Sequence, residues 1–156
     1  MSRAFTKEDD AGEDLPERPV PDGPNYVTPR GLEMLKETGR QLVERKRSAV
    51  PGEDLRPIER DLRYLEARIG GAIVVPPGSG DDVRFGARVS IEDATGARTT
   101  FQIVGADEAR ADPATLPWSS PLVQAMFGAK AGDVVNWEGG EAAARYKIIS
   151  VEYPRS

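Results

Sequence analysis

The sequence contains no cysteine and no histidine. Without thiols or imidazoles, the chain cannot form a disulfide framework, a zinc site of the usual Cys/His type or a Ser-His-Asp triad. Chemistry would therefore depend on carboxylates, hydroxyls, lysines and arginines. Aromatic residues make up only 6% of the chain, no apolar run is long enough for a membrane span, and the N-terminus has no apolar signal segment. We expect a cytoplasmic protein with no membrane segment.

Charge and apolar content limit the size of the core and the ligands that the chain can bind. With 156 residues, of which 38% are hydrophobic, the chain can bury one modest core with appendages. The net charge of −5 argues against DNA phosphates as an intrinsic ligand. Residues 1–24 hold seven acids, three bases and four prolines and have little apolar content. This composition predicts a disordered acidic tail over residues 1–24.

Two segments after this tail carry helical signals. Thr28 is placed to cap a helix, Pro29 suits its first position, and leucines follow at helical spacing up to about Ser48. In the second segment, apolar residues recur at intervals of four, three and four residues, the spacing of a coiled-coil seam: Ile58, Leu62, Leu65 and Ile69. A Pro-Gly turn joins the two segments. Residues 25–71 therefore predict an antiparallel helical hairpin of coiled-coil type.

The periodicity changes to two in the last part of the chain. "VRFGARVSIED", "RTTFQIVG", "VVNWE" and "RYKIISVEY" alternate as strands do, whereas "IVVPPGSGDD" reads as a linker or an edge strand. Between these strands Ser120, Pro121 and Gly128 mark one short helix. We predict an α+β domain over residues 72–156, with an antiparallel sheet and one short helix.

Several of these blocks, in this order, resemble a known family. "VRFGARVSIED", "FQIVGADEA", "LPWSSPLVQAMFGAKAGDVV" and "YKIISVEY" look like the C-terminal domain of the Gre-type bacterial transcription elongation factors, the GreA/GreB class. "YVTPRGLEMLKETGRQL" looks like the start of that family's coiled coil. The resemblance covers the chain from about Asn25 to Tyr153 and marks it as a member with a short coiled coil.

The resemblance implies a fold, a partner and a way of acting. The C-terminal domain would be FKBP-like and would dock on the rim of the RNA polymerase secondary channel, while the coiled coil enters the channel. A protein of this kind is a monomer that acts in trans and is not itself an enzyme. Contact with nascent RNA would be indirect, and neither DNA nor a membrane would be an intrinsic partner.

Two groups of residues match functional positions of the family. Glu53 and Asp54 lie at the predicted tip of the hairpin, where, in the family, two acids help to hold a magnesium ion in the polymerase active site and stimulate RNA cleavage. The free protein would hold no metal or cofactor stably, because a tip of this kind shares its ion with the polymerase. Trp118, Ser119, Ser120, Pro121 and Leu122 match the loop that contacts the polymerase. The alternative for this loop is structural, with Ser120 and Pro121 starting a helix and Trp118 in the core.

The tip departs from the family pattern. The spacing Asp, two residues, Glu is absent, and Pro57 follows Asp54 at the third position. Helical arms of about 20 and 13 residues would span only roughly 30 and 20 Å, about three turns less each than the family's usual hairpin. One hypothesis is a secondary-channel regulator with weak or no cleavage stimulation, similar to the regulators of nucleoside diphosphate kinase. The other is a true cleavage factor that uses Glu53 and Asp54. A third, a peptidyl-prolyl isomerase, rests on the fold alone.

Overall fold

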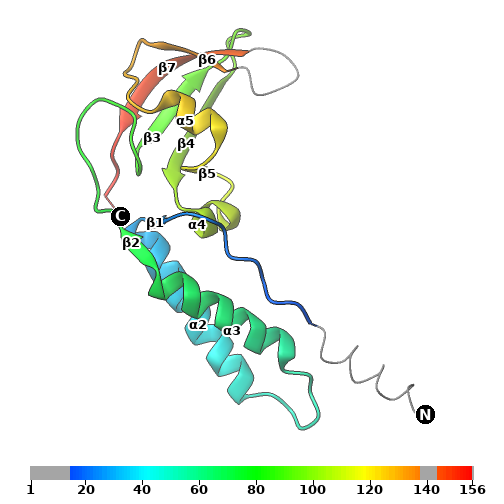
Figure 1. Ribbon diagram of the computed structural model, residues 1–156. Helices are drawn as coiled ribbons and strands as arrows, with labels where there is room; N and C mark the ends of the chain where they lie inside the picture. The colour runs from blue at the N-terminus through cyan, green and yellow to red at the C-terminus, as the bar shows by residue number, and fades with distance from the viewer. Residues whose placement is uncertain (1–14, 138–143, 156) are drawn as a thin grey trace. The chain divides into compact units, whose positions relative to one another are not determined.

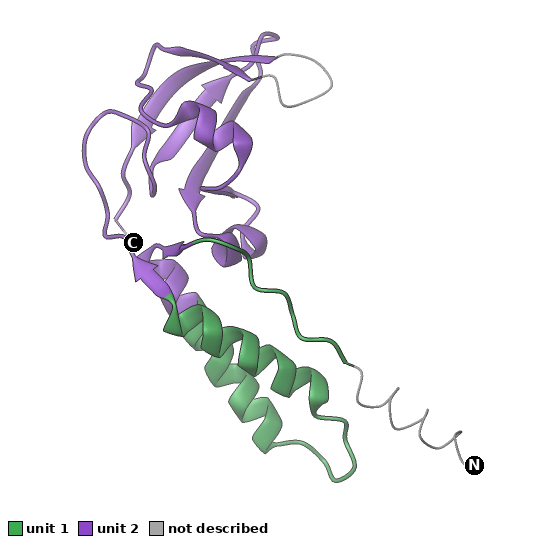
Figure 2. Cartoon of the chain, in the orientation of Figure 1, with its two compact units in different colours: residues 1–23, 35–71 green, residues 24–34, 72–156 purple. Residues whose placement is uncertain are grey.

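A computed structural model of the chain describes residues 15–137 and 144–155. The chain divides into two compact units, shown in different colours in Figure 2: unit 1 comprises residues 1–23 and 35–71, and unit 2 comprises residues 24–34 and 72–156. The sequence pattern predicts three parts, a tail over residues 1–24, a hairpin over 25–71 and a domain over 72–156; the first 14 residues of that tail lie outside the described residues, and the rest of the tail, up to Gly23, groups with the helices. Residues 25–34, which the sequence pattern assigns to the hairpin, group with the C-terminal domain.

Both predicted helices of the N-terminal half are present. α2 spans Pro29–Arg47 and α3 spans Arg56–Gly70. They lie side by side, joined by the loop of residues 48–55 (Figure 1). Lys46 near the end of α2 forms an ion pair with Glu59 near the start of α3, with Nζ 3.1 Å from Oε2. The finer prediction of a coiled-coil seam stays a prediction.

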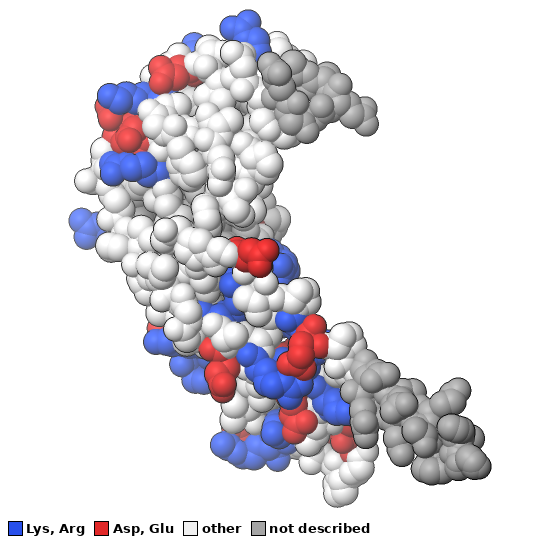
Figure 3. Space-filling view, in the orientation of Figure 1, with Lys and Arg blue, Asp and Glu red and all other residues white. Residues whose placement is uncertain are grey.

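A groove between the helices keeps part of their apolar surface accessible. Its volume is about 670 Å³, and Val43 on its wall remains 44% exposed. Gly39 also lines this groove. No atom lies within 4 Å of the place that a Cβ on Gly39 would occupy, so the space between the helices is open at this position. On the face that Figure 3 shows, acidic and basic side chains are interspersed over these helices.

The larger sheet of unit 2 has five strands in the order β5-β4-β3-β7-β6. These strands are β3 Arg88–Glu92, β4 Arg98–Val104, β5 Thr115–Pro117, β6 Val134–Trp137 and β7 Ala144–Glu152. β3 pairs antiparallel with both β4 and β7, and β6 pairs antiparallel with β7. β4 and β5, however, are parallel. The predicted antiparallel sheet is therefore wrong at this edge, and the sheet is mixed.

The prediction of one short helix is also wrong. The sequence pattern finds α5, Pro121–Met126, but misses α4, Ala106–Ala111. α4 makes the crossover between β4 and β5, which the parallel pairing requires. With only six residues, it has too few apolar positions to show a helical period.

A second, two-stranded sheet lies at the start of unit 2. β1, Asn25–Val27, pairs in parallel with β2, Ala72–Val74. The segment that reads from the sequence as either a linker or an edge strand is thus partly a strand. Its partner, β1, is too short for a periodicity argument to find.

The core of unit 2 lies on one face of the five-stranded sheet, under α5. Its fully buried side chains are Val89, Ile103 and Ile148 from the strands, Val123 and Met126 from the helix, and Val83 from the loop before β3; Val104, next to Ile103 on β4, is also fully buried but lies outside this cluster. The alternation predicts the buried positions of β3, where Val89 and Ile91 face the core, but not the consecutive buried pair Ile103 and Val104 of β4. Among the described residues, no helix is long and apolar enough to cross a membrane.

A buried carboxylate ties the start of α2 to α4 within unit 2. Glu108 is only 4% exposed; its Oε1 accepts a hydrogen bond from the Thr28 hydroxyl at 2.6 Å, and its Oε2 lies 2.9 Å from Arg30 Nη1. Thr28 caps α2 as predicted, since its Oγ1 accepts the Gly31 N–H at 2.8 Å. A Cβ on Gly31 would lie 2.7 Å from Glu108 Oε1, so glycine at this position permits the close approach.

Candidate functional site

The loop between α2 and α3 presents the two acids that the sequence singles out. Glu53 Oε1 accepts the Val50 N–H at 3.1 Å, and the Val50 carbonyl accepts the Glu53 N–H at 3.1 Å. Glu53 Oε2 forms an ion pair with Arg45 near the end of α2. Gly52 turns the chain with a φ of +87°, a conformation that favours glycine. These contacts make Glu53 part of the structure of the loop.

Asp54 is held by its near neighbour Arg56, at the first position of α3. Its Oδ1 accepts the Arg56 Nε–H at 2.8 Å and the Arg56 backbone N–H at 3.1 Å, and its Oδ2 accepts Nη2–H at 2.9 Å. The carboxylate and the guanidinium therefore face each other in a forked geometry, the arrangement in which such pairs bind best.

The arginines lower the pKa of both acids. Hydrogen bonds from the Arg56 side chain and then its backbone lower the pKa of Asp54 to about 2. The hydrogen bond from Arg45 lowers the pKa of Glu53 below its usual value, with a smaller contribution from the Val50 N–H. At neutral pH the loop thus carries two carboxylates with their charges balanced by two guanidinium groups.

These two carboxylates do not make a metal site by themselves. Magnesium takes six oxygen ligands and keeps several waters, so one or two carboxylates can serve it only where other ligands are supplied. Across residues 15–137 and 144–155, no group of three or more acidic or metal-binding side chains could hold an ion.

The second predicted site, the loop before α5, has an inward part and an outward part. Trp118 is half-buried, packs against the core and meets Tyr26 edge to face at 5.2 Å between ring centroids. Leu122 is likewise half-buried and packs on the core. Ser119 and Pro121 are exposed. Ser119 and Pro121 are therefore the accessible side chains of this loop, whereas Trp118 packs inward against Tyr26 and the core.

Ser120 and Pro121 occupy the positions predicted for a helix start. Ser120 is at the N-cap of α5, with an extended backbone, and its carbonyl accepts the Gln124 N–H at 2.9 Å. Its side chain makes no capping hydrogen bond, so only the position was predicted correctly and the hydroxyl is not used. Pro121 is in the first turn as expected.

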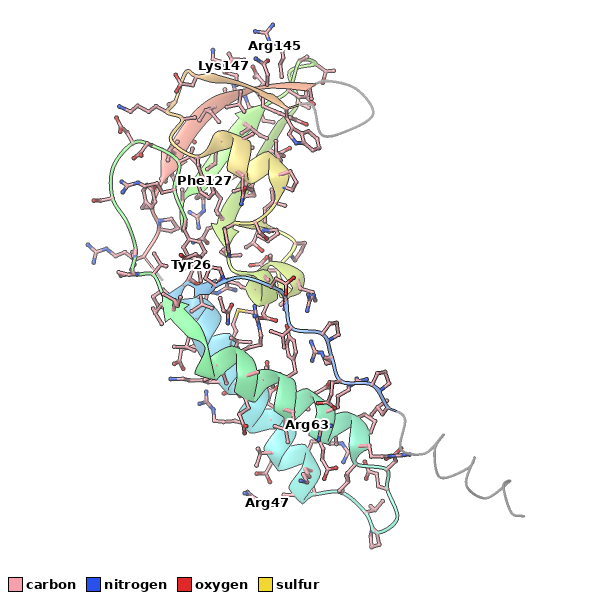
Figure 4. All side chains as sticks on the ribbon, viewed as in Figure 1. Tyr26, Arg47, Arg63, Phe127, Arg145 and Lys147 are labelled. Carbon is pink, nitrogen blue, oxygen red and sulfur yellow. The ribbon has the colours of Figure 1, made fainter. Side chains whose placement is uncertain are left out.

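An aromatic hollow beside this loop was not apparent from the sequence. It has a volume of about 330 Å³ and is lined in part by Tyr26, Phe85, Trp118 and Phe127. Phe127 is 38% exposed, and Figure 4 labels it together with Tyr26. Two of the hollow's four aromatic residues, Phe85 and Trp118, also pack against the core. Only the folded chain brings them together, so no local signal could have found it.

Comparison with known proteins decides the family. The family described as "Transcription elongation factor, GreA/GreB, C-term" matches residues 78–153. The transcription elongation factor GreB of Neisseria meningitidis serogroup A is 33% identical over 153 residues, covering 83% of this chain and 94% of the relative. The chain belongs to the GreA/GreB family. A GreA of Ralstonia nicotianae is 30% identical over 152 residues, covering 81% of this chain and 96% of the relative.

Solved structures of GreA/GreB-related proteins are also similar to this chain. The GreA factor homolog 1 (Gfh1) of Thermus thermophilus has 21% sequence identity and a TM-score of 0.40, covering 83% of this chain and 99% of that protein. A GreA/GreB factor from Nitrosomonas europaea has 22% identity and a TM-score of 0.42, covering 83% of this chain and 99% of that protein.

Proposed function

We propose that this GreA/GreB-family chain is a transcription elongation regulator that binds RNA polymerase at the secondary channel and stimulates RNA cleavage weakly or not at all. The elongation role is supported by the similarity to GreB, which extends over 83% of the chain. The observation that carries the mechanism is the short length of the two helices that flank the acidic loop, 19 residues in α2 and 15 in α3.

Helix length supports a regulator over a strong cleavage factor. α2 has 19 residues and α3 has 15, so at a rise of 1.5 Å per residue they span about 28 and 22 Å. As a coiled-coil hairpin, such a pair would enter the channel for a shorter distance than the family's usual hairpin. Glu53 and Asp54 at its tip would then stop short of the polymerase metal.

The engagement of the acids supports the same conclusion, though less strongly. A carboxylate that binds magnesium must first release its arginine, and exposed ion pairs are individually weak. The arginines therefore oppose metal binding without preventing it. The alternative function follows from this point: a cleavage factor in which Glu53 and Asp54 release their partners inside the polymerase. Bound magnesium would activate the attacking water there.

The docking surface that we propose is the loop before α5. Ser119 and Pro121 supply its exposed part, and Trp118, Ser120 and Leu122 hold the loop in place from beneath or at the helix start. A loop fixed in this way has little conformational freedom to lose on binding, which favours affinity. Packing on the core of the sheet keeps the exposed residues of the loop in a fixed position.

A cleavage assay separates the two functions. Purified protein is added to stalled, backtracked RNA polymerase with magnesium, and RNA length is followed over time. We expect at most slight shortening, unchanged in Glu53→Gln/Asp54→Asn. The control, Glu33→Gln/Glu66→Gln, removes the same charge from exposed helical positions. Strong shortening that is lost only in the first double variant would establish the cleavage factor.

Docking is tested by a matched pair of arginine substitutions. Ser119→Arg places a bulky charge on the exposed loop, and Thr99→Arg places the same group on an exposed position of β4. We expect Ser119→Arg to weaken polymerase binding about tenfold or more, as truncation of a central contact does, and Thr99→Arg to bind as the parent does. Circular dichroism checks that both fold. Equal affinities would refute the proposed surface.

A further inference from the structure

The described part of the N-terminal segment contacts one face of α3. Glu17 accepts two hydrogen bonds from the Arg63 guanidinium, at 2.8 Å from Nε and 2.6 Å from Nη2. The next residue, Arg18, places its guanidinium 3.8 Å from the centroid of the Tyr64 ring and Nη1 3.4 Å from Asp61 Oδ1. All these residues belong to unit 1, and Arg63 is labelled in Figure 4. The composition of the segment does not predict these contacts.

The contacts match in charge and in geometry. Along the segment an acid and then a base meet a base and an acid of α3, so each charge faces its opposite. The Glu17–Arg63 pair is forked, which orients both groups, and a guanidinium over an aromatic ring adds a cation–π contact. Tyr64 is only 5% exposed. A tail held by net charge alone would not place two successive side chains on two specific partners.

We propose that residues 15–23 are an autoinhibitory strap, which occupies the Asp61–Arg63–Tyr64 face of α3 and must leave it when the helices bind RNA polymerase. This inference rests on the proposed function, because α3 belongs to the helical pair that enters the channel. The strap lies along α3 and so increases the width of the helical pair. A narrow channel would admit the pair more readily once the strap has left. The strap also occupies the side chains of α3, Asp61, Arg63 and Tyr64, that would otherwise be accessible to a partner.

The strap is built to release. The Glu17–Arg63 pair is exposed at the surface, where such pairs are weak and screened by salt, and the Arg18–Asp61 pair is only half-buried. The hydrogen bond from the Arg63 side chain lowers the pKa of Glu17 below its usual value. A partner needs only to compete with a few side-chain contacts, and no part of the folded core has to open.

The position of the strap is measured first, without polymerase. The chain has no cysteine, so Val20→Cys/Ala67→Cys, at two exposed positions of unit 1, supplies the only thiols for a pair of spin labels. We expect one narrow distance distribution that broadens when Glu17→Arg is added. Asp22→Arg changes the net charge equally, at an exposed acid with no contact shown among the described residues, and should leave the distribution narrow. Adding Arg63→Glu to Glu17→Arg should restore it.

Polymerase binding is then compared for the unlabelled charge-reversal variants. An apparent affinity rises when the binding-competent fraction rises, so Glu17→Arg should bind about three- to tenfold more tightly than Asp22→Arg. A broad distribution in the parent overturns the strap, and equal affinities of the two variants overturn its gating role while leaving the proposed function intact. If neither variant nor the parent binds polymerase, the proposed function fails and the gating role fails with it.

Discussion

The buried carboxylate of Glu108 should be the most costly polar side chain to remove from unit 2. It is 4% exposed and receives the Thr28 hydroxyl at 2.6 Å, with Arg30 at 2.9 Å on its other oxygen. In Glu108→Ala the hydroxyl loses its acceptor and the start of α2 loses its link to α4. Arg30 keeps Asp112 at 3.3 Å and remains half exposed, so it is not left as a buried charge.

The size of the effect follows from these environments. A hydrogen bond to a charged group contributes about 1.5–3 kcal/mol, whereas breaking a fully buried ion pair costs about 3–5 kcal/mol. Because the Arg30 side chain is 49% exposed, the lower range applies. We expect Glu108→Ala to reduce the free energy of unfolding by about 2–3 kcal/mol.

Urea unfolding followed by tryptophan fluorescence measures this change. The chain has two tryptophans, Trp118 and Trp137, and both lie in unit 2, so the signal reports the unit that contains Glu108. Glu33→Ala is the control, because it removes an exposed acid from the same unit near the start of α2. If Glu108→Ala costs no more than this control, the buried network does not hold the start of α2 to α4.

Two further predictions use the same structural contacts. Gly31→Ala should destabilise unit 2 by about 1–3 kcal/mol, the usual cost of overpacking, because the new Cβ would lie 2.7 Å from Glu108 Oε1; the same fluorescence assay checks it, and an unchanged midpoint would count against the contact. For Asp54, hydrogen bonds from Arg56 lower the pKa to about 2. Because the folded pKa is depressed, the stabilising effect of this pair is present above the ordinary value of 3.8 and is lost as the pH falls through about 2. An NMR titration in which Asp54 protonates near pH 4 would refute the pairing.

Periodicity predicts the longer elements of this fold well. Helical spacing finds α2 and α3 to within a residue or two, and the alternation of apolar residues finds β3, β4, β6 and β7 and the buried positions of β3. These elements have enough residues to repeat a pattern, and one face of each is buried.

The elements that the sequence misses are short or depend on distant partners. β1 and β5 have three residues each, and α4 has six. Each is shorter than two full periods of its own kind of element, which are four residues for a strand and about seven for a helix. The parallel pairing of β5 with β4 is set by the α4 crossover, and a local pattern contains no information about strand direction.

For the candidate sites too, the sequence predicts the local features and misses the contacts between residues far apart in the chain. The positions of Glu53 and Asp54 at a loop, and of Ser120 and Pro121 at a helix start, follow from local turn and capping signals. Their contacts do not: Arg45 engages Glu53 from eight residues away, and Glu17 reaches Arg63 across 46 residues. Surface ion pairs of this kind leave no periodic trace in a sequence.

The central claim is that the protein enters the polymerase channel without strongly promoting cleavage, and competition tests it most directly. An authentic GreB is added at a fixed concentration to backtracked RNA polymerase with magnesium, and this protein is titrated in. We predict that the rate of RNA shortening falls as the protein displaces GreB, and that Ser119→Arg relieves this inhibition. A shortening rate that stays constant, or that rises with added protein, would contradict the claim.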